Sequence, residues 1–302
     1  MTKTPINTPL PDGANNGLLV ELKLQLVVFL REPPGPRMAR RMFEIYEPLF
    51  GDTFGIYKPT LDYAQLSDWD QTARNRYEHN ELPILRHHHI WGYGFQESKS
   101  RDARLFMYHG YRPHQECVMA SFCRFEFEAD LPPAKLLQFA EGLLAELPVL
   151  SAYGGFFFQG RPSDQYDARS ADRIYALSRR FWGVDVSDVE LTAEVMKTGY
   201  RSVNWLTAIS HVVDPELQLA LNQARNVAYR ATTLSTCTLF QASEGPIVGD
   251  RNRANDDLSG YMLLAEALSP LQILSHSAFR GERWNDQNTM AWLRRFTHPE
   301  DL

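Results

Sequence analysis

One order of segments occurs twice in this sequence and constrains the fold more than any other feature. In its first occurrence, apolar residues at every second position from 22 to 30 alternate with Glu21, Lys23 and Gln25, and residues 38–49 carry apolar side chains three and four positions apart. Alternation predicts a β-strand with one wetter face, and the wider spacing predicts an amphipathic α-helix. Pro33 and Pro34 separate the two segments, and residues 53–57 predict a second strand.

The same order returns further along the chain. Residues 118–129 and 153–158 have the pattern of strands, and an apolar stripe over residues 136–147 predicts a helix between them. A proline pair again separates the first strand from the helix. Two pseudo-repeated strand–helix–strand units predict an α+β fold, in which a mixed, largely antiparallel sheet carries helices on one face.

Shorter patterns complete the predicted fold. Residues 90–96 and 105–111 predict a β-hairpin that extends the sheet. The C-terminal half reads as more helical, with helices expected over residues 164–181, 214–224, 256–268 and 281–296.

The chain is long enough to bury a sizeable core. With 302 residues, of which 44% are hydrophobic and 23% charged, it has the composition of a globular protein. We expect a flexible N-terminal tail over residues 1–16 and a single α+β domain over residues 17–302. That domain is expected to have two subdomains, at about 17–160 and 161–302.

The cysteines and the N-terminus bear on the compartment. Cys117, Cys123 and Cys237 form no CxxC pair, which favours the reduced thiols of a cytosolic protein. Residues 1–16 lack the apolar run of a signal peptide, and the apolar stretch over residues 18–30 is too short and too charged to span a bilayer. We therefore expect a cytoplasmic protein that does not contact a membrane.

The familiar signatures of catalysis are missing from the sequence. It contains no phosphate-binding glycine loop, no GxSxG elbow and no HExxH helix. His87, His88 and His89 are consecutive, and in a strand His87 and His89 would point to one face and could share a divalent ion. Because spacing places no third ligand, we expect no metal site there, and no cofactor is expected. A metal-dependent enzyme centred on His87 and His89 remains an alternative.

The charge balance bears on the kind of partner. The net charge of −6 is opposite to that of a protein that neutralises nucleic-acid phosphates over a broad face. It is compatible with a basic protein partner, because opposite potentials speed encounter.

Three segments carry a resemblance to a known family. They are residues 179–186 (Arg-Arg-Phe-Trp-Gly-Val-Asp-Val), residues 199–207 (ending Val-Asn-Trp-Leu-Thr) and residues 292–296 (Trp-Leu-Arg-Arg-Phe). They resemble the pattern of the TsiV family of type VI secretion immunity proteins, and the resemblance covers residues 18–296. It implies a non-enzymatic protein that binds a cognate effector toxin, a nuclease acting in the cytoplasm, and occludes its active site or substrate-binding surface.

The motif residues have physical roles of their own. Gly183 is expected to end a helix in the left-handed conformation. The remaining motif positions are expected to hold the fold rather than the toxin. The structural set is Phe181, Trp182, Gly183, Asp185, Asn204, Trp205, Leu206, Thr207, Trp292 and Phe296.

The toxin-binding surface is sought where aromatic residues lie outside these motifs. Aromatic residues make up 12% of the chain, and interfaces favour aromatic anchors inside a polar rim. A secretion-system adaptor protein would also present such a surface and remains a further alternative. The candidate toxin-binding residues are Asp62, Tyr63, Asp68, Trp69, Asp70, Tyr77, Glu78, Trp91 and Tyr93.

Overall fold

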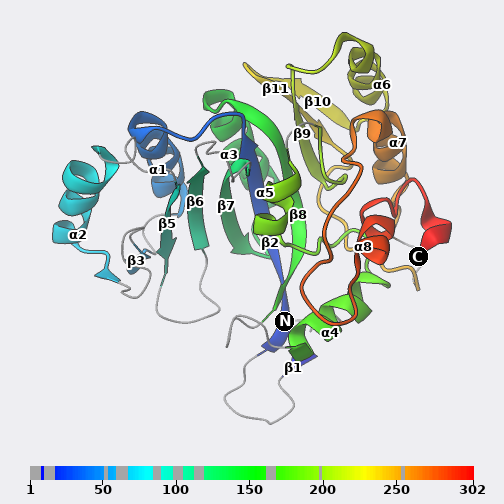
Figure 1. Ribbon diagram of the computed structural model, residues 1–302, viewed down its shortest axis with the longest axis horizontal. Coiled ribbons are helices and arrows are strands. Elements are labelled where there is room, and N and C mark those ends of the chain that lie inside the picture. The colour runs from blue at the N-terminus through cyan, green and yellow to red at the C-terminus, as the bar shows by residue number, and fades with distance from the viewer. Residues whose placement is uncertain are drawn as a thin grey trace.

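The computed structural model describes residues 8–9, 18–50, 54–58, 67–83, 90–97, 105–111, 119–160, 168–196, 199–252 and 256–302. Within them, eleven strands form one sheet, with the order β10-β11-β9-β8-β2-β7-β6-β5-β3-β4, and β1 pairs with β2 outside this path (Figure 1). The strands are β1 (Thr8–Pro9), β2 (Leu18–Leu30), β3 (Ile56–Lys58), β4 (Ser67–Asp68), β5 (Ile90–Gln96), β6 (Leu105–Tyr111), β7 (Ser121–Glu128), β8 (Val149–Gly160), β9 (Leu206–Ser210), β10 (Arg230–Thr233) and β11 (Cys237–Gln241).

Every pairing between these described strands is antiparallel. The α+β class is therefore confirmed, whereas the expected parallel component of the sheet is not observed among the described strands. The predicted hairpin is present, because β5 pairs with β6 from Ile90 opposite Tyr111 to Gln96 opposite Leu105.

The helices follow the apolar spacing of their sequences. In α1, Met42, Tyr46 and Phe50 recur every four residues and are all buried. The last helix, α8, begins with a capping box in which Asn285 and Asn288 each bond to the other's backbone N–H. The α-helices are α1 (Pro36–Phe50), α2 (Gln71–Arg76), α3 (Pro133–Glu146), α4 (Ala168–Ser178), α5 (Val189–Val195), α6 (Gln218–Val227), α7 (Ser259–Leu268) and α8 (Asp286–Leu293).

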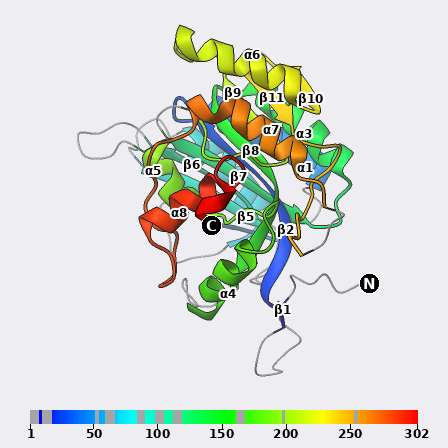
Figure 2. The same cartoon turned by 90° about the vertical axis from the view of Figure 1, so that its right-hand side faces the viewer.

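Helices cover both faces of the sheet, so the expectation of helices on one face is wrong. Leu24, Leu26 and Val28 of β2 belong to a first core that includes α1, α3, α6 and α7. Val27 and Phe29 of the same strand belong to a second core that includes α4, α5 and α8. Figure 2 shows the sheet edge-on between α5 and α8 on one side and α1 and α3 on the other.

The second core explains why the wetter face expected for β2 is buried. Lys23 and Gln25 are polar and alternate with leucines, but both are covered. The Lys23 ammonium lies 3.2 Å from a carboxylate oxygen of Glu128, and the Gln25 amide donates to Asp185 at 3.0 Å. Both faces of β2 are therefore buried. One face is apolar, and on the other the polar side chains have partners, as a buried polar group requires.

The two predicted repeat units form strand, helix and strand in the expected order but occupy different places in the sheet. In the second unit, β7 and β8 flank β2 directly. In the first unit, β2 and β3 are separated by β7, β6 and β5. The pseudo-repeat thus stays a prediction, as does the division into subdomains near residue 160. The sheet itself continues across that position, because β8 pairs with β9.

In the part of the chain that the structure describes, each helix is too short or too polar to cross a bilayer.

Candidate functional site

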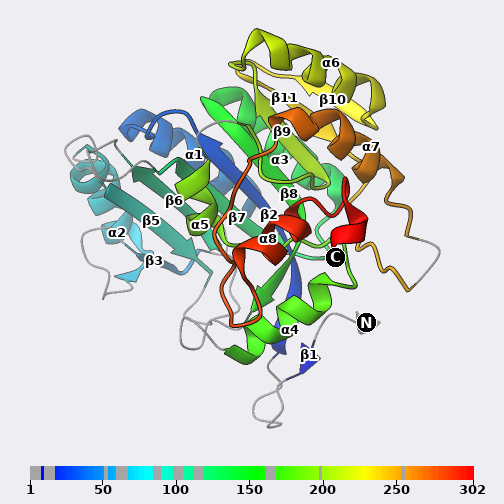
Figure 3. The same ribbon diagram turned by 45° about the vertical axis from the view of Figure 1, so that its right-hand side comes forward.

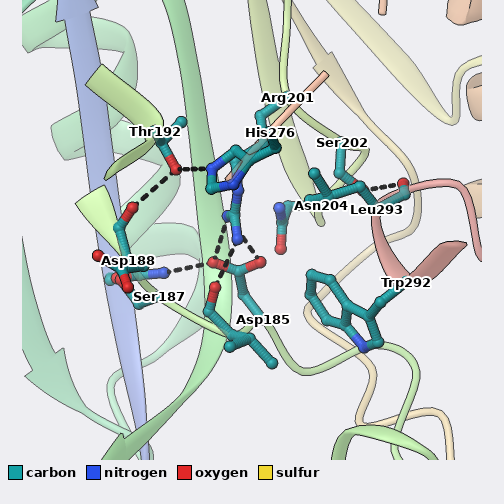
Figure 4. A network of polar contacts seen from close by, with 12 residues as sticks. Asp185, Ser187, Asp188, Thr192, Arg201, Ser202, Asn204, His276, Trp292 and Leu293 are labelled. Atoms are coloured by element: carbon teal, nitrogen blue, oxygen red, sulfur yellow. Dashed lines mark hydrogen bonds and ion pairs between the residues drawn. The ribbon is translucent and has the colours of Figure 1, made fainter. Parts of the chain in front are cut away.

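A buried ion pair lies at the centre of the second core (Figure 4). The Arg201 guanidinium donates from Nη1 to both carboxylate oxygens of Asp185, at 3.0 and 2.9 Å, and from Nη2 to the carbonyl oxygen of Val186. Both side chains are only 1% exposed. The rings of Tyr153 and Phe279 lie 5.2 Å from the guanidinium carbon. Fully enclosed groups of this kind organise a core rather than react with a substrate.

The pair is tied to the central strand of the sheet. Gln25 of β2 donates to Asp185, and Ser187 donates to the amide oxygen of Gln25 at 2.9 Å. The segment around Asp185 also forms a backbone bridge to β8, where the Asp185 N–H donates to Phe156 at 2.8 Å. These bonds fix the Arg179–Val186 motif against the sheet.

A histidine extends the same network. His276 Nδ1 lies 2.6 Å from the carbonyl oxygen of Ser277, so this nitrogen carries the proton, and Nε2 lies 3.0 Å from the Thr192 hydroxyl. That hydroxyl is also 2.7 Å from the carbonyl oxygen of Asp188, and it shares its one proton between the two acceptors. Burial and the nearby positive charge of Arg201 lower the pKa of His276 to about 4, which keeps the ring neutral.

The first motif holds a loop that we call the clamped loop, residues Ser243–Arg251. Backbone N–H groups of Trp182 and Gly183 donate to the carbonyl oxygens of Gly249 and Val248, both at 3.0 Å. A Cβ on Gly183 would lie 1.9 Å from the carbonyl oxygen of Ile247. The backbone of Gly183 does not have a positive φ, so the expectation that this residue ends a helix in the left-handed conformation is wrong. Its role is to let two backbone segments approach closely.

An ion pair fastens the far end of the clamped loop. Arg180 donates from Nε and Nη2 to the two carboxylate oxygens of Asp250, at 2.8 and 2.7 Å. The Arg251 guanidinium carbon stacks 4.0 Å from the ring centre of Trp182. A bidentate contact of an arginine with a carboxylate fixes the orientation of both side chains as well as their distance.

The second motif holds the near end of the clamped loop, and the third motif supports the first. Trp205 donates from Nε1 to the carbonyl oxygen of Ser243 at 2.9 Å, and its own carbonyl accepts from Ala242 at 2.9 Å. Arg295 of the third motif donates from Nε to the carbonyl oxygen of Trp182 at 2.7 Å. The first two motif segments therefore bond to the clamped loop, and the third supports the first. Their buried side chains are Phe181, Trp182, Asp185, Asn204, Trp205, Leu206, Thr207, Trp292 and Phe296.

The clamped loop forms one wall of an open pocket of about 580 Å³. Tyr229 and the first turn of α7 complete the pocket. Figure 3 shows α6 and α7 on the same side of the molecule as β10 and β11. Gly260 allows α7 to approach closely, because a Cβ there would lie 2.0 Å from the carbonyl oxygen of Ala242. The lining residues are Val227, Tyr229, Ala242, Ser243, Glu244, Gly245, Pro246, Ile247, Asp257, Ser259 and Gly260. Sequence reasoning missed this pocket, which only the folded chain assembles.

Three of the aromatic residues predicted to bind the toxin have described side chains, and these are buried or half-buried. Tyr77 and Tyr93 are 1% and 4% exposed, which corrects the expectation that they anchor a partner. Trp69 is half-buried and packs edge-on against Phe43 and Phe95, at ring distances of 5.6 and 5.0 Å. The physical reason is that α1 covers this end of the sheet, and these aromatic side chains fill the space between the helix and the strands.

The polar members of the predicted set lie at the β4 edge. Asp68 and Asp70 are exposed and Glu78 is half-buried. Asp70 also caps α2, since its side chain accepts from the Ala73 N–H at 2.8 Å. Asp62 and Tyr63 lie outside the described residues, and so does the side chain of Trp91, whose backbone belongs to β5.

The predicted metal alternative cannot be placed, because residues 87–89 lie outside the described part of the chain. Within that part, no group of three or more His, Cys, Asp or Glu side chains could hold a metal ion.

Comparison with known proteins identifies the family. A search of the curated proteins finds no match. Among solved structures, the Pseudomonas aeruginosa type VI secretion protein PA0821 has the same fold, with a TM-score of 0.77 at 18% identity, over 98% of this chain and 90% of that one. The sequence model of TsiV, described as type VI immunity for VRR-NUC, matches residues 41–296. The chain therefore belongs to the TsiV family, the type VI immunity proteins for VRR-NUC nuclease effectors.

Proposed function

We propose that this chain neutralises its cognate nuclease effector by binding it and covering its active site or substrate-binding surface. The family match over residues 41–296 carries this proposal. It is supported by the architecture, in which two motif segments hold one surface loop and a third supports the first, because a rigid surface loses little entropy when it binds.

Charge supports a nuclease as the partner. An enzyme that cleaves nucleic acid needs a basic surface for the phosphate backbone. The chain has 37 acidic against 31 basic side chains, so it carries the complementary sign. A protein that lies over the basic surface of the nuclease excludes the substrate without any chemistry of its own.

The β4 edge is the steering surface in this account. Asp68, Asp70 and Glu78 lie there beside the half-buried Trp69. Charges outside the centre of an interface act mainly on the association rate, because their field reaches about 8 Å through physiological salt.

The chain acts as a stoichiometric inhibitor in the cytoplasm, with no catalytic step. This compartment holds the nucleic acid that the effector attacks, so inhibitor and toxin meet there. The role differs from that of an adaptor, which would bind the secretion apparatus and leave the nuclease active.

The test is a cleavage assay with the nuclease effector encoded beside this chain. Purified effector is mixed with increasing amounts of the chain, and cleavage of a linear DNA is followed. The expected result is complete inhibition at an equimolar ratio, together with co-elution of the two proteins. An effector that cleaves at its full rate beside a molar excess of the folded chain contradicts the proposal.

A further inference from the structure

Two exposed carboxylates line the pocket beside the clamped loop. Glu244 and Asp257 are exposed, and no ion pair joins either of them to a described residue. The Asp257 carboxylate accepts a hydrogen bond from the Ser259 N–H at 2.8 Å, and this bond lowers the pKa of the carboxyl group. Both carboxylates face solvent, where a cation of a partner can reach them.

An exposed aromatic ring completes the pocket. Tyr229 lies two residues after the end of α6 and is 62% exposed, although it is a large and partly apolar side chain. Its backbone is fixed, since its N–H donates to Gln241 at 3.0 Å. Tyrosines in this setting are favoured as interface anchors, because they offer contact area at a low cost in conformational entropy.

The walls of the pocket are rigid. The carbonyl of Ser243 accepts from Trp205, and the Ser243 hydroxyl donates to the carbonyl oxygen of Gly245 at 2.6 Å. The Ile247 N–H donates to the buried Tyr261 hydroxyl at 3.3 Å. A preformed pocket of this kind needs no reorganisation when a side chain enters it.

We propose that this pocket receives an arginine side chain of the effector, which pairs with Glu244 and Asp257 and stacks on Tyr229. The inference rests on the proposed function and adds the anchoring point of the complex. An arginine fits better than a lysine, because its planar guanidinium can pair with carboxylates and stack on an aromatic face at the same time. A nuclease surface that binds phosphate supplies such arginines.

The anchor and the steering surface lie at opposite ends of the sheet. The strand order places β10 at one end and β4 at the other, nine strand spacings apart. At about 4.8 Å for each spacing, this is about 43 Å along the sheet. An interface of about 800 Å² on each partner is about 30 Å across, so the two surfaces cannot both lie at its centre. The β4 edge acts on the approaching effector at low salt, where the field of a charge reaches about 30 Å. The rigid pocket with an exposed aromatic residue is the centre.

The test measures dissociation of the effector, inactivated at its catalytic site, from the full-length chain. The variants are Tyr229→Ala, Glu244→Gln and Asp257→Asn, the last of which keeps the acceptor for Ser259. Each variant is expected to raise the dissociation rate constant about tenfold or more, because removal of one partner of a covered charge pair acts on dissociation. Leu274→Ala and Glu216→Gln, at exposed positions that do not line the pocket, are expected to leave it unchanged.

A second measurement identifies the occupant. Surface arginines of the effector are replaced one at a time by alanine and combined with Glu244→Gln. One arginine is expected to show a double-variant effect well below the product of the two single effects. Unchanged dissociation rates in all three pocket variants, while the wild-type complex forms, overturn the inference and leave the proposed function standing. Failure of the wild-type chain to bind the effector overturns both.

Discussion

The Trp205 indole donates a hydrogen bond from Nε1 to the carbonyl oxygen of Ser243, 2.9 Å away. Trp205 is a buried residue of a family motif, and Ser243 begins the loop that lines the exposed pocket. This contact connects the scaffold to the surface. It explains how residues that never reach solvent can shape the surface that meets a partner.

Trp205→Phe tests this connection. The change removes the donor and some volume, and we expect the free energy of unfolding to fall by about 1–3 kcal/mol. We also expect faster dissociation of the effector, because the Ser243 end of the clamped loop loses its anchor. Urea unfolding and binding kinetics measure the two effects. Trp284→Phe, in the second core, should lower stability but leave dissociation unchanged; equal dissociation from both variants would count against the connection.

Gly183→Ala tests the close approach of the first motif to the clamped loop. The new Cβ would lie 1.9 Å from the Ile247 carbonyl oxygen, so one backbone must move. We expect a loss of about 2–4 kcal/mol in the free energy of unfolding, in the range of strained or overpacked substitutions.

Gly142→Ala is the matched control. Gly142 lies within α3, and a Cβ there meets nothing within 4 Å. Alanine favours the helix over glycine by about 0.5–1 kcal/mol, so this variant should be more stable than the wild type. Thermal unfolding of the two variants side by side checks the prediction, and similar melting temperatures for both would refute it.

Arg201→Met tests the buried ion pair. The change leaves the Asp185 carboxylate enclosed without its counter-charge, which costs about 3–5 kcal/mol in comparable cases. The double variant Asp185→Leu/Arg201→Met should recover part of that loss, since it removes both charges. Arg41→Ala breaks an exposed pair with Glu146 and should change stability by less than about 1 kcal/mol. A double variant no more stable than Arg201→Met would show that the charge imbalance is not the cause.

His276 predicts a dependence of stability on pH. Its pKa is about 4 in the folded chain and near 6.5 when unfolded, so between these values the unfolded chain binds more protons. Its contribution to stability is therefore full above about pH 6.5 and is lost as the pH falls toward 4, at up to about 1.4 kcal/mol per pH unit.

The His276→Gln variant isolates this contribution. Its free energy of unfolding should fall less steeply than that of the wild type between pH 6.5 and 4, because the carboxylates titrate in both proteins. Urea unfolding at intervals of half a pH unit measures the difference. Parallel curves for the two proteins would mean that His276 is not held neutral by its surroundings.

The steering surface predicts a salt-dependent association rate. The combined variant Asp68→Asn/Asp70→Asn/Glu78→Gln should associate with the effector several-fold more slowly at low salt, with little change in dissociation. The difference should vanish at high salt, where screening removes the field of the wild-type carboxylates. Stopped-flow association at two ionic strengths checks this. Asparagine at position 70 keeps the cap of α2, so the fold is preserved.

Local pattern predicted the individual elements better than their assembly. The hairpin of β5 and β6 follows directly from strand-forming residues on both sides of a polar turn. By contrast, the polar residues Lys23 and Gln25 predicted a wet face, because single-strand alternation cannot show that α4, α5 and α8 cover the same face from far along the chain.

The same limit applies to the candidate site, whose residues come together only in the folded chain. Aromatic content could not separate Tyr77, which is buried, from Tyr229, which is exposed, because the difference arises only from tertiary packing. The motif segments were recognisable in the sequence, but their contacts with the clamped loop were not: Arg180 bonds to Asp250, 70 positions further along the chain, and Trp205 bonds to Ser243, 38 positions further along. The spacing of residues in one sequence cannot predict that the first motif approaches the clamped loop. Covariation between Gly183 and Ile247 across related sequences could have revealed this approach.

Immunity to a nuclease is the central claim, and a titration of nuclease activity tests it most directly. The cognate effector is held at a fixed concentration above the dissociation constant, and the chain is added in steps while DNA cleavage is measured. The account predicts a linear fall in the cleavage rate that reaches zero at one chain per effector. Cleavage that continues at its initial rate beyond the equimolar point would contradict it.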